Sequence, residues 1–243
     1  MLYLFTVSRS AFFLALQALL TVFFSAVALL TFPFTLRTRY RVISSWSRLM
    51  VWLARLICGI RYEVIGLGNL PSEPSIVLSK HQSAWETLVF QVILPPQVWV
   101  LRRSLLKVPF FGWGLAMMKP IAIDRDAGMR ALKQTLEQGR ERLREGFWII
   151  VFPEGTRVPP GETGTYQVGG AWLAKQTGAP VVPVAHNAGY LWQRNAFVKF
   201  PGKITVSIGK PIDTTGLSVN EINERTRDWI ESEMRKMGSS RCS

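Results

Sequence analysis

Residues 10–36 contain no charged side chain, and this apolar segment limits the possible folds of the chain more than any other feature. At the rise of an α-helix these 27 residues would extend roughly 40 Å, more than the hydrocarbon core of a bilayer requires. The segment therefore predicts a membrane-anchoring helix. A cleaved signal peptide is disfavoured, because the apolar run is too long and Arg9 is the only charge before it.

Arginines around this segment predict its orientation. Arg9 alone precedes it, whereas four arginines follow it closely: Arg37, Arg39, Arg41 and Arg48. An arginine-rich flank indicates the cytoplasmic side. Residues 46–60 are also apolar but carry Arg48 and Arg55 on one helical face, which is typical of a helix lying among lipid headgroups. Pro33 interrupts the first helix near its end, so a single span and a bent insertion into one leaflet both remain open.

The chain is strongly basic, with 29 Lys and Arg against 16 Asp and Glu and a net charge of +13. Such a balance predicts an anionic partner, namely nucleic acid, a membrane surface or a phosphorylated substrate. Nine Trp and 14 Phe favour the membrane, and the sequence lacks zinc-finger spacing, an RNP-like strand and basic blocks, so no nucleic-acid partner is expected. Cys58 and Cys242 predict neither a disulfide framework nor a metal site, and they indicate a reducing compartment.

After residue 61, short apolar runs alternate with amphipathic ones. The runs predict strands at 74–80, 97–101, 147–152, 180–185 and 203–209, and helices at 126–146, 169–178 and 218–237. Ser218 and Glu221 have capping-box spacing at the start of the last helix. We expect an α/β fold with a mostly parallel sheet flanked by helices, preceded by hydrophobic N-terminal membrane-anchoring helices. The anchoring part would cover residues 1–61, and one further domain residues 62–243.

The stretch "SKHQSAWE" (79–86) allows two interpretations. Ser83 and Glu86 have the spacing of a helix capping box, in which case His81 is only a loop residue. Alternatively, the chain bends so that the Glu86 carboxylate accepts one imidazole N–H of His81 and leaves the other nitrogen free as a base. No G-x-S-x-G nucleophile is present, so such a pair suits removal of a proton from a substrate hydroxyl. His186, after a later strand, is either a core residue or part of the same site.

The stretch "FPEGTR" (152–157) predicts a tight turn after a strand. Thr156 and Arg157 offer the donors that a phosphate requires, although the turn could instead carry a solvated arginine. Arg125, between Asp124 and Asp126, is a second phosphate-binding candidate or an ion-pair partner of these acids. Because His81 and this turn both follow strand ends, we expect them to face one crevice.

Four blocks together resemble the glycerolipid acyltransferase family, most of all its bacterial members that acylate 1-acyl-sn-glycerol 3-phosphate. In order, the blocks are "HQSAWE" (81–86), "RRSLLKVPFFGWG" (102–114), "FPEGTR" (152–157) and "VVPVA" (181–185). The resemblance covers about residues 75–190, and the hydrophobic N-terminus also fits it.

The resemblance implies transfer of a fatty acyl group from acyl-ACP or acyl-CoA to the 2-hydroxyl of lysophosphatidic acid, giving phosphatidic acid. His81 would be the general base and Glu86 its orienting partner. The glycerol phosphate would be bound by Arg125, Glu154, Gly155, Thr156 and Arg157, with help from Arg102. No cofactor or metal is implied. The partners would be lysophosphatidic acid, acyl carrier protein or a CoA thioester, and membrane phospholipid, with the catalytic domain on the cytoplasmic side of a bacterial inner membrane.

Three positions depart from the pattern of the family. Glu86 replaces the usual Asp, Arg102 replaces a Lys, and Gln167 stands where a basic residue is often found. These departures leave open an acyltransferase of the same family that acts on another lyso-lipid, such as a lyso-ornithine lipid or another lysophospholipid. An alternative of another class is a non-catalytic membrane scaffold that holds anionic lipid through its basic surface.

Overall fold

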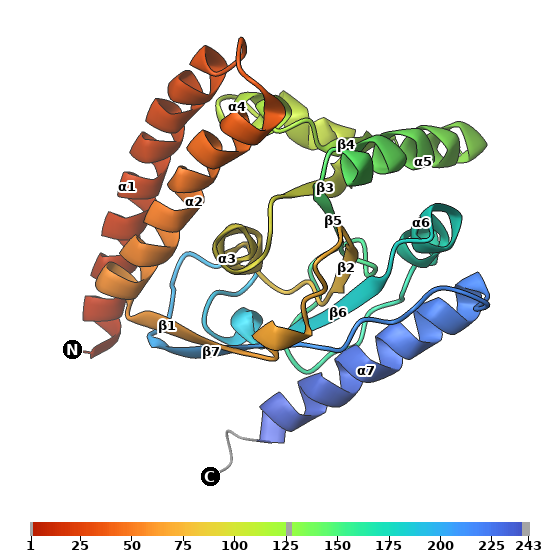
Figure 1. Ribbon diagram of the computed structural model, residues 1–243. Coiled ribbons are helices and arrows are strands. Elements are labelled where there is room, and N and C mark those ends of the chain that lie inside the picture. Colours follow the sequence, from red (N-terminus) through yellow and green to blue (C-terminus); the bar gives the residue numbers. More distant parts are fainter. Residues whose placement is uncertain (1, 125–127, 240–243) are drawn as a thin grey trace.

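A computed structural model describes residues 2–124 and 128–239, and its centre is a seven-stranded sheet (Figure 1). The strand order is β1-β7-β6-β2-β5-β3-β4. All neighbouring pairs are parallel except β6 and β7, which are antiparallel, so the predicted mostly parallel α/β fold is confirmed. The strands are β1 (Ile60–Ile65), β2 (Ile76–Ser79), β3 (Gln97–Arg102), β4 (Ile121–Ile123), β5 (Trp148–Val151), β6 (Val181–His186) and β7 (Gly202–Ile208).

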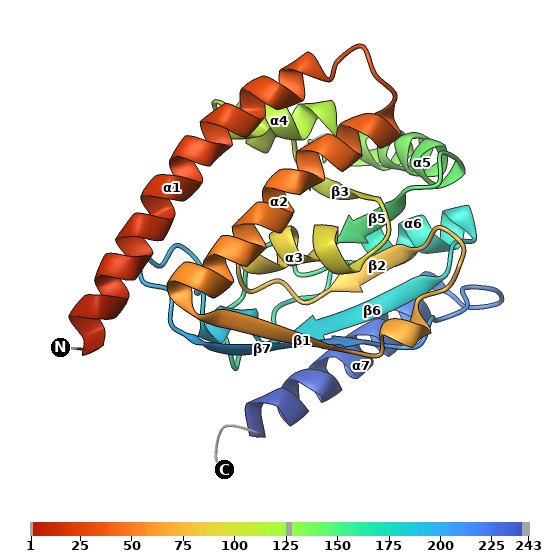
Figure 2. The ribbon, with the colours of Figure 1, turned by 60° about the vertical axis from the view of Figure 1, so that its left-hand side comes forward.

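Helices cover both faces of the sheet (Figures 1 and 2). One face carries α3 (Trp85–Ile93) beneath α2 (Leu36–Cys58), and the other carries α5 (Gly128–Arg144), α6 (Gly169–Thr177) and α7 (Val219–Ser239). Strands β2, β5 and β6 are buried along their whole length, because helices exclude water from both sides. This explains why these strands read as continuous apolar runs rather than as alternating patterns.

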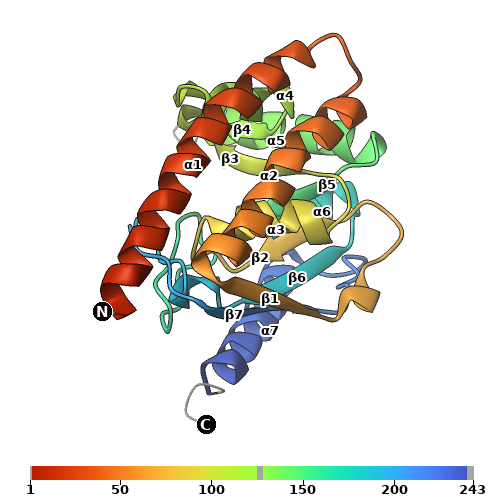
Figure 3. The same ribbon diagram turned by 90° about the vertical axis from the view of Figure 1, so that its left-hand side faces the viewer.

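The N-terminal segment forms a hairpin of two long helices, α1 (Leu2–Leu30) and α2, which lies along one side of the molecule (Figure 3). Pro33 lies in the turn between them, and Arg9 of α1 donates a hydrogen bond to the Ile57 carbonyl at the far end of α2. The helix expected at 46–60 is therefore the second half of α2. By length and composition α1 could cross a membrane over Tyr3–Leu30, with a mean hydropathy of 2.3.

The hairpin packs onto the rest of the protein instead of standing apart from it. Phe13 of α1 and Met50 and Ala54 of α2 are buried in the same apolar core as the central strands. The chain passes into the sheet at Gly59, whose φ of 71° ends α2 in the left-handed conformation that glycine adopts without strain. The expected division of the chain near residue 61 stays a prediction.

The remaining elements are short. Among the described residues they are α4 (Phe111–Met117) and 3₁₀ turns at Leu67–Asn69, Arg103–Lys107 and Ala188–Tyr190. The capping box expected before α7 is present: Ser218 N–H donates to the Glu221 carboxylate at 2.8 Å, and Glu221 N–H donates to the Ser218 hydroxyl at 3.2 Å. Satisfying these N–H groups stabilises the first turn of α7.

Candidate active site

Two neighbouring strands bring the expected site segments together. β2 ends at Ser79, just before His81, and the adjacent parallel strand β5 ends at Val151, just before the 152–157 turn. The Val158 N–H donates to the His81 carbonyl at 2.8 Å and ties the two segments to each other. Gly155 has a φ of 66°, which glycine adopts without the strain that a side chain would cause. The carboxyl edge of the sheet therefore carries both segments, as its topology requires.

His81 and Glu86 form a hydrogen-bonded pair, with 2.7 Å between Nδ1 and Oε1. Glu86 lies in the first turn of α3 and is fully buried. The same carboxylate oxygen accepts the backbone N–H groups of Gln82 at 3.0 Å and Ser83 at 2.8 Å. The capping box is only half formed: the Ser83 N–H reaches the Glu86 carboxylate, but the Ser83 hydroxyl accepts the Trp85 N–H at 3.1 Å and α3 is preceded by Ala84. The same carboxylate holds the His81 imidazole, so His81 is more than a loop residue.

The surroundings of Glu86 keep it ionised. Burial by itself opposes ionisation, but the neighbouring His186 and His81 imidazoles and the Ser83 N–H outweigh it, so the pKa of Glu86 is lowered from its ordinary value. An ionised Glu86 accepts the Nδ1–H of His81, which leaves Nε2 with its lone pair. The Phe152 ring stacks on the imidazole with centroids 3.9 Å apart and limits its rotation.

His81 opens onto a cavity of about 830 Å³, here called the His81 cavity, that lies between the sheet edge and the α1–α2 hairpin. Polar and cationic side chains line part of it: Arg102, Thr156, Arg157 and Arg194, beside Gly155. Apolar side chains from α1, α2 and α4 line much of the rest, among them Leu14, Phe24, Ala28, Ile43, Trp46, Phe111 and Leu115. One space thus offers an imidazole base, several arginines and room for a hydrocarbon chain.

Glu154 does not take the position expected of a phosphate ligand. Its side chain is buried, and its carboxylate accepts from Lys80 Nζ at 2.7 Å, His81 N at 3.0 Å and Gly164 N at 3.1 Å. A carboxylate would also repel a phosphate. Its contacts instead hold the His81 backbone against the 152–157 turn, so Glu154 positions the site and does not line the cavity.

A buried cation, not predicted from the sequence, lies behind this turn. Lys80 is fully buried and bridges Glu154 to Glu231 of α7, with 3.0 Å between its Nζ and the Glu231 carboxylate. The same Glu231 carboxylate accepts from the hydroxyls of Tyr166 and Thr163, each at 2.8 Å. A Lys at the end of an otherwise apolar strand was the available signal, because a buried ammonium requires carboxylate partners.

The other expected residues have differing positions. Arg102, Gly155, Thr156 and Arg157 line the His81 cavity, and Arg125 lies outside the described residues. Arg194 also lines the cavity and donates to the Thr156 hydroxyl at 3.2 Å and to the Arg157 carbonyl at 3.3 Å. Arg194 was not predicted as a site residue, because it lies in a loop outside the four family blocks.

His186 is a core residue, which decides between its two interpretations. It is fully buried, its Nε2 donates to the Lys80 carbonyl at 2.9 Å, and its Nδ1 accepts the Ala188 N–H at 3.3 Å. Burial lowers the pKa of His186 despite the Glu86 carboxylate 4.0 Å away. Gln167 is exposed and lies outside the lining of the His81 cavity, so its departure from the family pattern does not alter the cavity.

Metal ligands require clusters of suitable side chains. Over residues 2–124 and 128–239, no group of three or more His, Cys, Asp and Glu side chains is placed to hold a metal ion. Cys58 is a buried free thiol, and Cys242 lies outside the described residues.

Comparison with known proteins identifies the family. The acyltransferase family model matches residues 61–187. The 1-acyl-sn-glycerol-3-phosphate acyltransferase of Pseudomonas aeruginosa is 48% identical over 202 residues, which cover 82% of this chain and 79% of that protein. The Saccharomyces cerevisiae enzyme of the same name is 31% identical over 208 residues, covering 82% and 68%. The crystal structure of a Thermotoga maritima 1-acyl-sn-glycerophosphate acyltransferase covers 98% of each chain with a TM-score of 0.82 at 21% identity, which shows a shared fold. The chain therefore belongs to the acyltransferase family, and it is an enzyme of that class.

Proposed function

We propose that this enzyme transfers a fatty acyl group from a thioester donor, acyl-ACP or acyl-CoA, to the 2-hydroxyl of 1-acyl-sn-glycerol 3-phosphate and so forms phosphatidic acid. The observation that carries the proposal is the His81–Glu86 pair, 2.7 Å apart, at a cavity that also holds arginines and apolar walls. The relatives from Pseudomonas aeruginosa and Saccharomyces cerevisiae are named for this acceptor, which supports the choice. Membership of an enzyme family favours catalysis over the scaffold alternative.

In the proposed mechanism His81 Nε2 removes the proton from the 2-hydroxyl of the acceptor as its oxygen attacks the thioester carbonyl. The tetrahedral intermediate then breaks its C–S bond, the thiol sulfur leaves, and the imidazolium returns the proton to it. Glu86 stabilises the imidazolium and keeps the proton on Nδ1 in the resting state. The acyl group passes directly from donor to acceptor, so the step requires neither a protein nucleophile nor a bound cofactor.

The arginines of the cavity would bind the phosphate of the acceptor. Arg194 lies at the 152–157 turn, since it donates to the Thr156 hydroxyl and to the Arg157 carbonyl. Guanidinium groups bind phosphate through paired hydrogen bonds. Arg102, at the end of β3, lines the same cavity and would assist. Arg125, outside the described residues, stays a proposed ligand of the same phosphate.

The apolar walls of the cavity would hold the acyl chains, and they come from the helices that we expect in the membrane. Leu14 and Phe24 of α1 and Ile43 of α2 line the space that His81 reaches. Substrate chains could then pass from the lipid phase to the base without crossing water. Arginines after the apolar segment favour a catalytic domain on the cytoplasmic side of a bacterial inner membrane.

The test is an assay of membranes containing the protein, with lysophosphatidic acid and either acyl-ACP or acyl-CoA, that follows formation of phosphatidic acid. We expect product with the wild type and none above background with His81→Ala. An acceptor screen with lyso-ornithine lipid and with other lysophospholipids belongs to the same experiment. Faster turnover of an acceptor without phosphate than of lysophosphatidic acid would reject the proposed substrate.

A further inference from the structure

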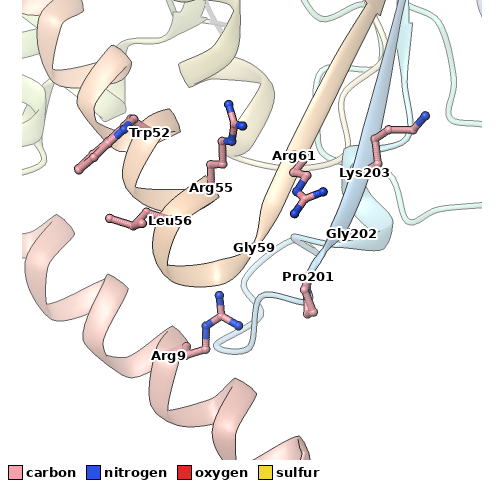
Figure 4. Close-up of a pocket in the computed structure, with 9 residues that line it drawn as sticks. All are labelled: Arg9, Trp52, Arg55, Leu56, Gly59, Arg61, Pro201, Gly202 and Lys203. Atoms are coloured by element: carbon pink, nitrogen blue, oxygen red, sulfur yellow. The ribbon is translucent and has the colours of Figure 1, made fainter.

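A second cavity, of about 790 Å³, lies where the α1–α2 hairpin joins the sheet (Figure 4). We call it the Arg9 pocket. Its lining includes four cationic side chains, Arg9, Arg55, Arg61 and Lys203, and the apolar side chains of Trp52, Leu56 and Pro201. Figure 4 shows that the four cationic side chains come from four elements, α1, α2, β1 and β7. None of its lining residues belongs to the His81 cavity, so the two spaces are distinct.

The Arg9 pocket is positively charged. None of the described residues that line it is acidic. Lys203 is partly neutralised by Glu63 at 2.9 Å, and Arg9 donates to the Ile57 carbonyl at the end of α2. Arg55 and Arg61 are exposed, so their guanidinium groups supply most of the available positive charge. Several guanidinium groups around one hollow suit a phosphate, which they bind through paired hydrogen bonds.

The apolar neighbours of these arginines indicate which phosphate. Trp52 and Leu56 are 56% and 62% exposed on α2, beside Arg55, and Phe5 of α1 lies against the Arg9 guanidinium at 5.2 Å. Tryptophan and arginine side by side are typical of the lipid headgroup region, where the indole contacts acyl chains and the cation contacts phosphate. Inorganic phosphate would gain nothing from these apolar side chains, whereas a phospholipid would contact both kinds.

We propose that the Arg9 pocket binds the phosphate group of an anionic membrane phospholipid at a site separate from the His81 cavity. Because the pocket joins the hairpin to β1 and β7, a bound lipid holds the sheet and the hairpin at one depth relative to the headgroups. The same contact orients the His81 cavity, whose walls include α1 and α2, toward the lipid phase. The site thus acts in membrane binding and takes no part in the chemical step.

The test measures binding of the full-length protein to vesicles of phosphatidylcholine with and without phosphatidylglycerol. The double variant Arg55→Gln, Arg61→Gln should lose affinity for the anionic vesicles by about five-fold for each arginine and bind neutral vesicles as the wild type does. The matched control removes equal charge from helices remote from the pocket, with Arg140→Gln on α5 and Arg225→Gln on α7, both exposed. Equal losses in the two double variants would show a general charge effect and overturn the proposal.

A second arm separates a built phosphate site from simple attraction. Arg55→Lys with Arg61→Lys keeps the charge but lacks the guanidinium fork, so this variant should also lose affinity for the anionic vesicles. Wild-type affinity in the lysine variant would overturn the proposal. Titration of the detergent-solubilised protein with inorganic phosphate tests the other source, and saturable binding that the lysine variant lacks would assign the pocket to free phosphate instead of lipid.

A third measurement keeps this inference independent of the proposed reaction. With detergent-dispersed substrates the turnover number of the glutamine double variant should equal that of the wild type, since neither arginine lines the His81 cavity. The unfolding midpoint of each variant is measured alongside, because a folded variant with weak anionic-vesicle binding isolates the effect on the pocket. A reduced turnover number in detergent would contradict the separation of the two sites.

Discussion

The His81 cavity and the Arg9 pocket have similar sizes, about 830 and 790 Å³, and both are lined by arginines and by residues of α1 and α2. They differ in whether buried ionisable side chains support the residues that line them. At the His81 cavity a buried carboxylate holds an imidazole, and a buried Lys80–Glu154 pair holds the backbone beside it. Among the described residues, the lining of the Arg9 pocket has three arginines and Lys203 but neither a histidine nor a carboxylate. Arginines alone provide binding, whereas the buried support makes a site capable of chemistry.

The strongest test of this difference is His81→Ala. We expect acyl transfer to fall by about 10²–10⁴-fold, because the acceptor hydroxyl loses its general base. The matched variant at the other cavity, Arg55→Gln, should keep its turnover number in detergent. Initial rates of phosphatidic acid formation measure both, with circular dichroism to confirm folding. Full activity of His81→Ala would remove the distinction between the two cavities.

The next largest effect is expected at Glu86. In Glu86→Gln the side chain no longer carries the charge that stabilises the imidazolium, and we expect a loss of roughly 10²-fold or more in the turnover number. Glu86→Asp keeps the charge and should retain substantial activity. Glu86→Ala also leaves the buried N–H groups of Gln82 and Ser83 without their acceptor, so it should lose stability as well as activity.

Thermal unfolding separates these contributions. If Glu86 only caps α3, then Glu86→Gln and Glu86→Asp would change the unfolding midpoint while their rates stay equal to the wild type. A reduced rate with an unchanged midpoint in Glu86→Gln would instead support the role of the carboxylate in holding His81.

A smaller effect should distinguish the arginines of the His81 cavity from those of the Arg9 pocket. Arg157→Gln and Arg194→Gln each remove hydrogen bonds to a charged group, worth about 1.5–3 kcal/mol, so we expect the KM for lysophosphatidic acid to rise by about 10–100-fold. The KM for the acyl donor should change little. Steady-state kinetics with each substrate varied in turn checks this, and an equal rise in both KM values would show that these arginines do not select the acceptor phosphate.

Local patterns were sufficient to predict much of the fold. Continuous apolar runs predicted the buried strands β2, β3, β5, β6 and β7, and the Ser218–Glu221 spacing predicted the start of α7. Strands β1 and β4 were missed, because β1 is partly exposed at the sheet edge and β4 has only three residues. The helix α2 was predicted only from residue 46. Its first ten residues include three arginines and few apolar side chains, so they show no clear apolar pattern.

The site was predicted where its residues are close in sequence. The His81–Glu86 contact spans five residues, so a helix start was enough to suggest it. Lys80–Glu231 spans 151 residues and Arg194–Thr156 spans 38, and only the packing of α7 and of a loop against the sheet edge brings these pairs together. Glu154 was predicted to bind phosphate for the same reason. Its place in the 152–157 turn does not reveal that its carboxylate pairs with the buried Lys80, which is distant in sequence.

The smallest effect concerns the support behind the His81 cavity. Burial opposes ionisation of Glu231, but its hydrogen bonds from Lys80, Thr163 and Tyr166 outweigh burial, so the pKa of Glu231 is lowered from its ordinary value. A carboxyl with a lowered folded-state pKa stabilises the protein above the unfolded-state value and loses that contribution as the pH falls through the folded-state pKa. Glu231→Gln should therefore reduce stability near pH 7 by about 1–2 kcal/mol, a few degrees in unfolding midpoint.

The loss of stability in Glu231→Gln should depend on pH, whereas a substitution at the Arg9 pocket should show no such dependence. The difference in midpoint between wild type and Glu231→Gln should be constant above about pH 5 and shrink at lower pH, as the wild type also loses its charge. At the Arg9 pocket, Arg61→Gln removes an exposed cation that forms no ion pair with a buried acid among the described residues, so its midpoint should follow the wild type at every pH. A constant difference for Glu231→Gln down to acidic pH would show that the buried ion pair does not stabilise the edge of the sheet that holds His81.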